Sequence, residues 1–114
     1  MEPLQRAAAI QRRIGDHSRE AMALDCTGET YRELGQSQEG VKFHLQAARQ
    51  HRELSDRWQF AVALDNLATA LTEAERPAEA RRHWEEASTL LDDFPDTRAT
   101  TLRERVNDPR ENRH

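Results

Sequence analysis

The chain has 114 residues, of which 36% are hydrophobic and 33% are charged, and its formal net charge at pH 7 is −4. This length allows one domain at most, and the negative charge argues against nucleic acid as a direct partner. A single cysteine, Cys26, excludes an internal disulfide and suits a cytoplasmic protein; no apolar stretch approaches the ~18 residues of a membrane span, so no membrane partner is expected.

Helix-favouring residues dominate the chain, which is therefore predicted to be all-α. Apolar residues recur at helical spacing in six segments. Gly15-Asp16 is expected to end the first helix, Gly35 to end the second, and Pro77 to begin the fifth. The predicted helices cover residues 3–14, 17–34, 37–54, 57–74, 77–91 and 95–106, and the polar tail 107–114 is predicted to be disordered.

The sequence repeats itself with a period of about 40 residues, within the range of known repeat families. A shift by one period places residues 21–25, AMALD, on residues 61–65, AVALD. The same shift places Ala47 on Ala87 and Glu33 on Glu73. A fixed period of this length is typical of stacked-repeat proteins, whose surfaces mostly bind partners.

In the first period, the inward residues Leu24, Thr27, Gly28 and Tyr31 have the spacing of the four letters in W-x2-L-G-x2-Y, and Gly40 and His44 have that of A-x3-F. This spacing resembles the tetratricopeptide repeat (TPR) family, with Thr27 and His44 as departures and with a repeat longer than the usual one. The resemblance implies an all-α, right-handed stack of helical hairpins. The residues that it implies for packing between helices are Leu24, Gly28, Tyr31, Ala47, Leu64, Leu67, Ala68, Leu71, Ala80, Trp84 and Ala87.

The resemblance also implies one TPR domain over residues 1–106. Its expected parts are the second helix of a partial repeat at 3–14, repeats at 17–54 and 57–91, and a capping helix at 95–106. Repeats of this length are similar to those of kinesin light chains and of many bacterial signalling proteins.

Runs such as TYRELG at residues 30–35 and AEARRHWEEA at 78–87 carry a narrower likeness. They resemble the C-terminal repeats of actinobacterial regulators of the antibiotic-regulatory-protein type, which join a DNA-binding domain, a switch ATPase and a TPR array. This likeness implies an alternative function, as a sensor or autoregulatory TPR segment of a larger transcriptional regulator.

In TPR proteins the first helix of each repeat lines a concave groove. By their positions in the repeat, the residues expected to line this groove are Asp25, Glu29, Arg32, Glu33, Asp65, Asn66, Thr69 and Glu73. Most are acidic, so the leading prediction is non-catalytic binding of a partner protein or peptide with basic residues. The other interpretation is a solvated polar face. Asp25 and Glu29 stand where a carboxylate clamp needs basic residues, which excludes chaperone-tail binding.

No enzyme chemistry is predicted from the sequence. It lacks a phosphate-binding loop, a dinucleotide glycine pattern, a metalloprotease motif and a nucleophile elbow, and Cys26 has no neighbouring base pattern. His44, His51 and His83 lie on predicted second helices, but no cysteine or carboxylate completes a zinc set at standard spacing. We therefore expect neither a cofactor nor a metal.

The first predicted helix, residues 3–14, lacks the preceding helix that would pair with it in a full repeat. Its small apolar stripe runs from Leu4 to Ile14. Stacking against a second copy, or exchange at Gly15-Asp16, would cover this stripe and give a weak homodimer.

Overall fold

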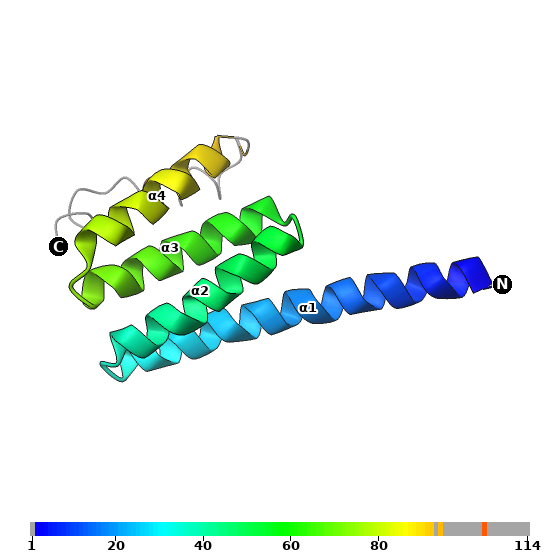
Figure 1. Ribbon diagram of the computed structural model, residues 1–114, viewed down its shortest axis with the longest axis horizontal. Coiled ribbons are helices and arrows are strands. Elements are labelled where there is room, and N and C mark those ends of the chain that lie inside the picture. Colours follow the sequence, from blue (N-terminus) through cyan, green and yellow to red (C-terminus); the bar gives the residue numbers. More distant parts are fainter. Residues whose placement is uncertain (1, 93, 95–103, 105–114) are drawn as a thin grey trace.

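The computed structural model describes residues 2–92, Phe94 and Glu104, with side chains from Arg13 onward. It contains four helices: α1 (Glu2–Glu33), α2 (Ser37–Glu53), α3 (Arg57–Glu73) and α4 (Pro77–Leu91) (Figure 1). No strand occurs among the described residues, which confirms the all-α prediction for this part of the chain. None of the described helices is both long and apolar enough to pass through a membrane. The helix predicted at 95–106 and the tail 107–114 lie outside the described residues.

Three turns of one geometry, evenly spaced along the chain, separate the helices. Gly35, Ser55 and Glu75 have φ of +76°, +58° and +64°, in the left-handed region. In each turn the N–H of this residue donates to the carbonyl three residues before it, and the next N–H donates to the carbonyl five residues before itself. These paired bonds satisfy carbonyls that the end of a helix leaves without partners. Gly35 therefore ends its helix in the way that the sequence predicted.

The expected break at Gly15-Asp16 does not occur, because α1 runs through both residues without interruption. The helices predicted at 3–14 and 17–34 are therefore one helix. Gly15 precedes Gly35 by the same interval that separates the three turns, so the spacing alone would allow a turn here. However, a glycine inside a helix costs only about 1 kcal/mol relative to alanine, which is too little to interrupt the helix. A turn here would give up several backbone hydrogen bonds, and only a helix folded back on α1 would offset them. The N-terminal half of α1 instead extends beyond the other helices (Figure 1).

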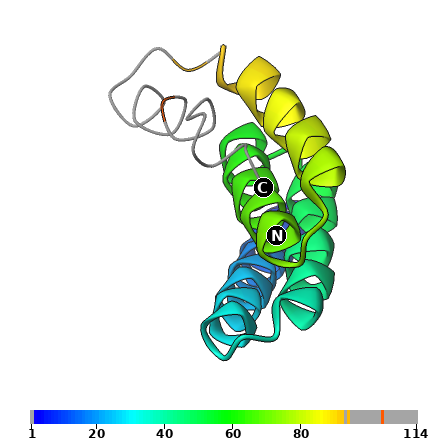
Figure 2. The same cartoon turned by 90° about the vertical axis from the view of Figure 1, so that its left-hand side faces the viewer.

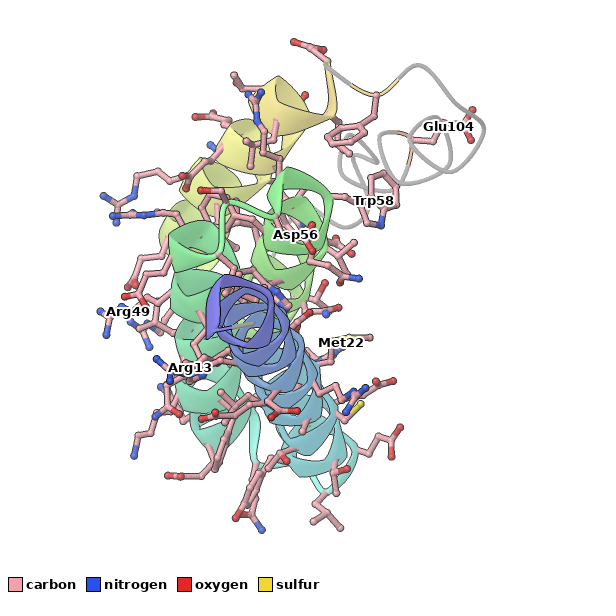
Figure 3. The ribbon with its side chains drawn as sticks, turned by 90° about the vertical axis from the view of Figure 1, so that its right-hand side faces the viewer. Arg13, Met22, Arg49, Asp56, Trp58 and Glu104 are labelled. Carbon is pink, nitrogen blue, oxygen red and sulfur yellow. The ribbon has the colours of Figure 1, made fainter. Side chains whose placement is uncertain are left out.

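Each helix packs against the next one along the chain, and α1 also contacts α3. The four packed helices form an array with two sides, with α1 and α3 on one side and α2 and α4 on the other (Figure 2). The labelled side chains show the same division, since Met22 and Trp58 project on the side of α1 and α3, and Arg49 projects on the opposite side (Figure 3). We call the side of α1 and α3 the odd face, and the side of α2 and α4 the even face.

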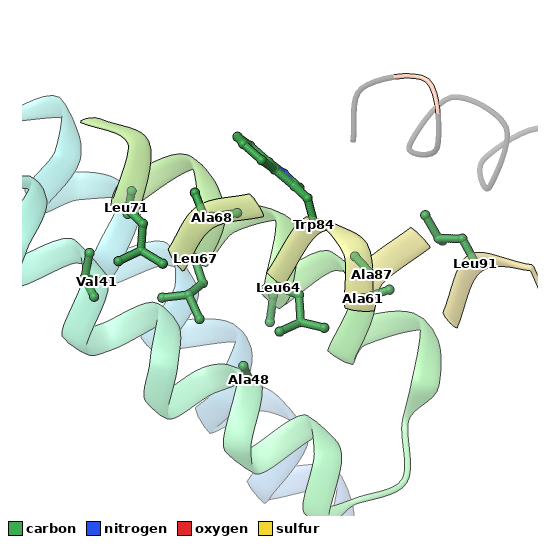
Figure 4. Close-up of a cluster of buried hydrophobic side chains, with 13 residues drawn as sticks. Val41, Ala48, Ala61, Leu64, Leu67, Ala68, Leu71, Trp84, Ala87 and Leu91 are labelled. Carbon is green, nitrogen blue, oxygen red and sulfur yellow. The ribbon is translucent and has the colours of Figure 1, made fainter. Parts of the chain in front are cut away.

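The core consists mainly of alanine and leucine side chains gathered around α3 (Figure 4). Nine of the 17 residues of α3 are buried, more than in α2 or α4. Small alanine side chains let the backbones of neighbouring helices approach closely, while leucine and Trp84 supply most of the buried apolar area. Among the residues that the TPR resemblance implied for packing, Leu24 and Tyr31 are half-buried. The buried ones are Gly28, Ala47, Leu64, Leu67, Ala68, Leu71, Ala80, Trp84 and Ala87.

The contact between α1 and α2 is closest at two glycines. A Cβ atom added to Gly40 would lie 2.9 Å from the carbonyl oxygen of Gly28. A Cβ atom added to Gly28 would lie 2.8 Å from Nε2 of His44. Real Cβ atoms do not approach other atoms this closely, so the two glycines set the distance between these helices.

Three large apolar side chains are exposed among the described residues: Ile14 (50%), Met22 (47%) and Leu34 (65%). Leu34 follows the last residue of α1 and lies at the turn to α2. Ile14 lies on α1, in its N-terminal half. The stripe that begins at Leu4 lies among side chains that are not described, so the homodimer stays a prediction.

Candidate functional site

The residues predicted to line a concave groove lie on α1 and α3, the two helices of the odd face. The structure places them in three different settings. Two aspartates turn inward toward the following helix, two residues pair with each other between α1 and α3, and the others range from exposed to buried.

Asp65 was expected on an open acidic strip, but its side chain is only 1% exposed. The indole N–H of Trp84 on α4 donates to Oδ1 of Asp65 at 3.0 Å. A carboxylate is costly to bury unless hydrogen bonds replace its water. Asp65 therefore joins the two helices of its hairpin and is not available to a partner.

Asp25 occupies the position of Asp65 in the preceding repeat and makes the corresponding contact. Its Oδ1 lies 2.8 Å from Nδ1 of His44 on α2, and its side chain is 14% exposed. Because a carboxylate can only accept, the Nδ1–H tautomer of His44 donates this bond. His44 corresponds to Trp84 in the same way, so each hairpin contains one aspartate that accepts from a ring N–H of the next helix.

This pair of contacts was missed in the sequence, although the repeat contains the signal. A shift by one period aligns Asp25 with Asp65 and His44 with Trp84, and both rings carry an N–H donor. His44, which departs from the aromatic residue usual at this position of the repeat, thus keeps the N–H donor of Trp84 in a smaller ring. Its ring packs on Gly28, which explains the glycine at that position.

Arg32 and Glu73 were also expected in the groove, and they pair with each other. Nε and Nη2 of Arg32 donate to the two carboxylate oxygens of Glu73 at 3.0 and 2.9 Å, and Ser37 Oγ donates to Glu73 at 3.2 Å. The hydrogen bond from Arg32 lowers the pKa of Glu73, and the same bond raises the pKa of Arg32. This ion pair with two hydrogen bonds links the first hairpin to the second. It also neutralises much of the negative charge that Glu73 was expected to give the groove.

The remaining predicted groove residues differ in exposure. Glu29 and Glu33 are exposed on α1, and Asn66 is half-buried on α3. Thr69 is 8% exposed, and its hydroxyl donates to the carbonyl oxygen of Asp65 within α3. The acidic surface is therefore smaller than predicted and lies on α1.

His51 is fully buried, and neither of its ring nitrogens has a hydrogen-bond partner among the described residues. Its Nε2 lies 3.9 Å from Oδ2 of Asp25, too far for a hydrogen bond. Burial lowers the pKa of His51, although the nearby carboxylates of Asp25 and Asp56 act in the opposite direction. A neutral imidazole is thus held in the interior beside two carboxylates.

We expect acid to destabilise the fold through His51. Its folded-state pKa lies below the ordinary value of 6.5, so the unfolded chain binds more protons just below pH 6.5. The free energy of unfolding should fall as the pH drops through this window, and His51→Gln should reduce that slope. Urea unfolding at pH 7.0, 6.5, 6.0 and 5.5 measures it.

His17→Gln, which removes an exposed histidine, is the control and should keep the slope of the unaltered protein. Some slope should also remain in His51→Gln, because burial lowers the pKa of His83 as well. Equal slopes for His51→Gln and the unaltered protein would contradict the prediction.

Two of the three histidines considered as metal ligands, His44 and His51, approach the carboxylate of Asp25. Nδ1 of the third, His83, lies 3.9 Å from Oε1 of Glu86. In the part of the chain that the structure describes, no group of three or more histidine, cysteine, aspartate or glutamate residues could hold a metal ion.

Comparisons with protein-family models, with curated proteins and with solved structures find no significant match to this chain.

Proposed function

We propose that the chain is a non-catalytic protein-interaction module made of TPR-type helical hairpins, and that a partner segment binds along α1 on the odd face. The sequence repeat supports this proposal, as does the placement of the first helix of each hairpin on one side (Figure 2). The repeated contact from an aspartate to a ring N–H further supports equivalent hairpins. Stacked hairpins expose long helical surfaces, and such proteins commonly use them for binding.

The observation that carries the proposal is an exposed strip along α1. It consists of Met22, Cys26, Glu29 and Glu33, which are spaced four, three and four residues apart and are all exposed. This spacing places them on one side of a helix. The strip is about 16 Å long, which matches about five residues of an extended chain. We call it the α1 strip.

The chemistry of the α1 strip favours a segment with both apolar and basic residues. Met22 is 47% exposed and offers a flexible apolar contact. Glu29 and Glu33 lie one helical turn apart and are both exposed, and the guanidinium of the neighbouring Arg32 is already held by Glu73. A partner with one apolar residue and two cationic residues would complement this surface.

The proposal predicts that charge reversal on the α1 strip weakens binding. The probe is a fluorescein-labelled peptide with one leucine and two arginines, titrated by fluorescence anisotropy. Glu29→Lys combined with Glu33→Lys should weaken binding about tenfold, which corresponds to about 1.4 kcal/mol. Added salt should weaken the binding to the unaltered protein, because exposed charges are screened.

Glu53→Lys combined with Glu85→Lys is the matched control. Both residues are exposed, both lie on helices of the even face, and the net charge changes equally. This variant should bind within about twofold of the unaltered protein, since exposed charges outside the contact contribute little. If the two double variants weaken binding equally, the peptide responds to net charge alone and the assignment to the α1 strip fails.

A further inference from the structure

A pocket of about 300 Å³ lies where the end of α2, the turn to α3, the first turn of α3 and the end of α4 meet. Its volume is at the lower limit of pockets that hold small molecules. Its apolar walls are Phe60 and Leu90, which pack on the core but remain partly exposed. The described residues that line it are His51, Arg52, Ser55, Asp56, Arg57, Phe60 and Leu90.

Two arginines and one carboxylate are among the described residues that line this pocket. Arg52 and Arg57 line it, and both are exposed. Asp56 is the one carboxylate in the described lining, and its Oδ1 accepts from the backbone N–H of Gln59 at 3.1 Å as the N-cap of α3. The pocket is therefore suited to a ligand with a negative group and an apolar body.

His51 gives the pocket a buried polar group without a hydrogen-bond partner. Its side chain is 0% exposed, and neither ring nitrogen is hydrogen-bonded among the described residues. Such a group is normally satisfied by protein or by a bound molecule, because leaving it unpaired is costly. His51 lines the same pocket as the apolar walls and the arginines.

The corresponding place in the first hairpin has different chemistry. A shift by one period places Glu20 on Phe60 and Gln50 on Leu90. There, Nε2 of Gln50 donates to Oε1 of Glu20 at 3.3 Å, so polar side chains stand in place of the apolar walls. A pocket lined by His17, Glu20, Gln50, Glu53 and Leu54 lies there too, so the apolar lining, and not the pocket itself, distinguishes the second hairpin.

We propose that this pocket binds a small amphipathic organic anion, whose apolar body lies between Phe60 and Leu90 and whose carboxylate group faces Arg52. His51, whose buried ring has no hydrogen-bond partner among the described residues, lines the same site. This site is independent of the proposed partner surface on α1, since the two share no residue.

Ligand binding is coupled to proton uptake by His51. The charged groups near its ring are Asp25 on α1, Asp56 in the turn, Arg52 on its own helix and Arg57 on α3. A bound carboxylate adds negative charge and favours the imidazolium form. Affinity for the anion therefore increases as the pH falls from 7.5 to 5.5, a range in which a simple carboxylate stays ionised.

Octanoate is the probe, and its binding to the full chain is measured by calorimetry and by the NMR signals of the His51 ring. We expect a Kd on the order of 1 mM or tighter, with a shift of the His51 signals on titration. Arg52→Glu and Leu90→Gln should each weaken binding at least fivefold. Glutamine is chosen at position 90 because the first hairpin has glutamine, Gln50, at the corresponding position and accommodates it there.

Two controls separate the anion site from general apolar or charge effects. Arg49→Glu changes an exposed arginine on α2 that does not line the pocket and should leave octanoate binding unchanged. Octanol, which has the same tail without the charge, should bind at least fivefold more weakly than octanoate. The proposal is overturned if the His51 signals do not move, if octanol binds as well as octanoate, or if Arg49→Glu weakens binding as much as Arg52→Glu.

Discussion

Replacing Trp84 with alanine is expected to lower the free energy of unfolding by about 3–5 kcal/mol. Trp84 is 3% exposed and belongs to the main hydrophobic cluster, so its removal leaves a large cavity between α3 and α4. The substitution also removes the N–H that donates to the buried carboxylate of Asp65. Both losses act on the folded state, and for a chain this short they amount to a large part of the total stability.

Urea unfolding followed by circular dichroism measures this effect. One further variant separates the loss of the hydrogen bond from the loss of apolar contact, and a second serves as a control. Trp84→Phe keeps most of the apolar contact but loses the N–H, and should cost about 1–3 kcal/mol. Trp58→Ala removes the other tryptophan, which is half-buried and lies edge-on against Phe94 at 5.4 Å between ring centroids. This control should cost less than Trp84→Ala. A loss below about 1 kcal/mol for Trp84→Ala would contradict the buried contact that the structure shows.

Gly40→Ala is expected to destabilise the protein by about 1–3 kcal/mol, although alanine is the better helix former. The new methyl group would lie 2.9 Å from the backbone oxygen of Gly28, so α1 and α2 would have to move apart. Gly28→Ala should act in the same direction, because its methyl group would contact the buried ring of His44 at 2.8 Å. Thermal and urea unfolding both report the change.

Gly15→Ala is the matched control for these two variants. Gly15 lies inside α1, and an added Cβ atom would have no neighbour within 4 Å. Here only the intrinsic helix preference remains, so the same substitution should stabilise the protein by about 0.5–1 kcal/mol. The expected signs are therefore opposite, and a loss of stability for Gly15→Ala would show that the helix does not continue through this residue.

The sequence contained enough information to predict the three turns and most of the interior. Gly35 and Pro77 lie at helix boundaries as predicted, and the small residues Ala47 and Ala87 are fully buried where the repeat places them. These signals are local or periodic, so they can be detected without knowing which helices touch. Gly15 has the same local signal as Gly35, but a turn at this position also depends on a neighbouring helix, which the local sequence does not specify.

The inward orientation of Asp25 and Asp65 could not be derived from helical phase alone. Asp65 follows the buried Leu64 and precedes the half-buried Asn66, so it lies at the border between the interior and the odd face. At such a border, the donor offered by the neighbouring helix decides which way a short polar side chain turns. That donor, Trp84, lies on the next helix, and only the folded hairpin brings the two together.

The contacts from aspartate to ring N–H have a consequence for how such a chain can grow in evolution. Each lies within one hairpin, so duplication of a gene segment one period long copies both partners at once and yields a hairpin that is already joined internally. The link between hairpins is different, because Arg32 and Glu73 belong to different copies. Thr72 occupies the position of Arg32 in the second copy, which therefore does not retain the arginine. Duplication thus preserves the interior of each unit, whereas each new junction has to acquire its own contacts by later substitution.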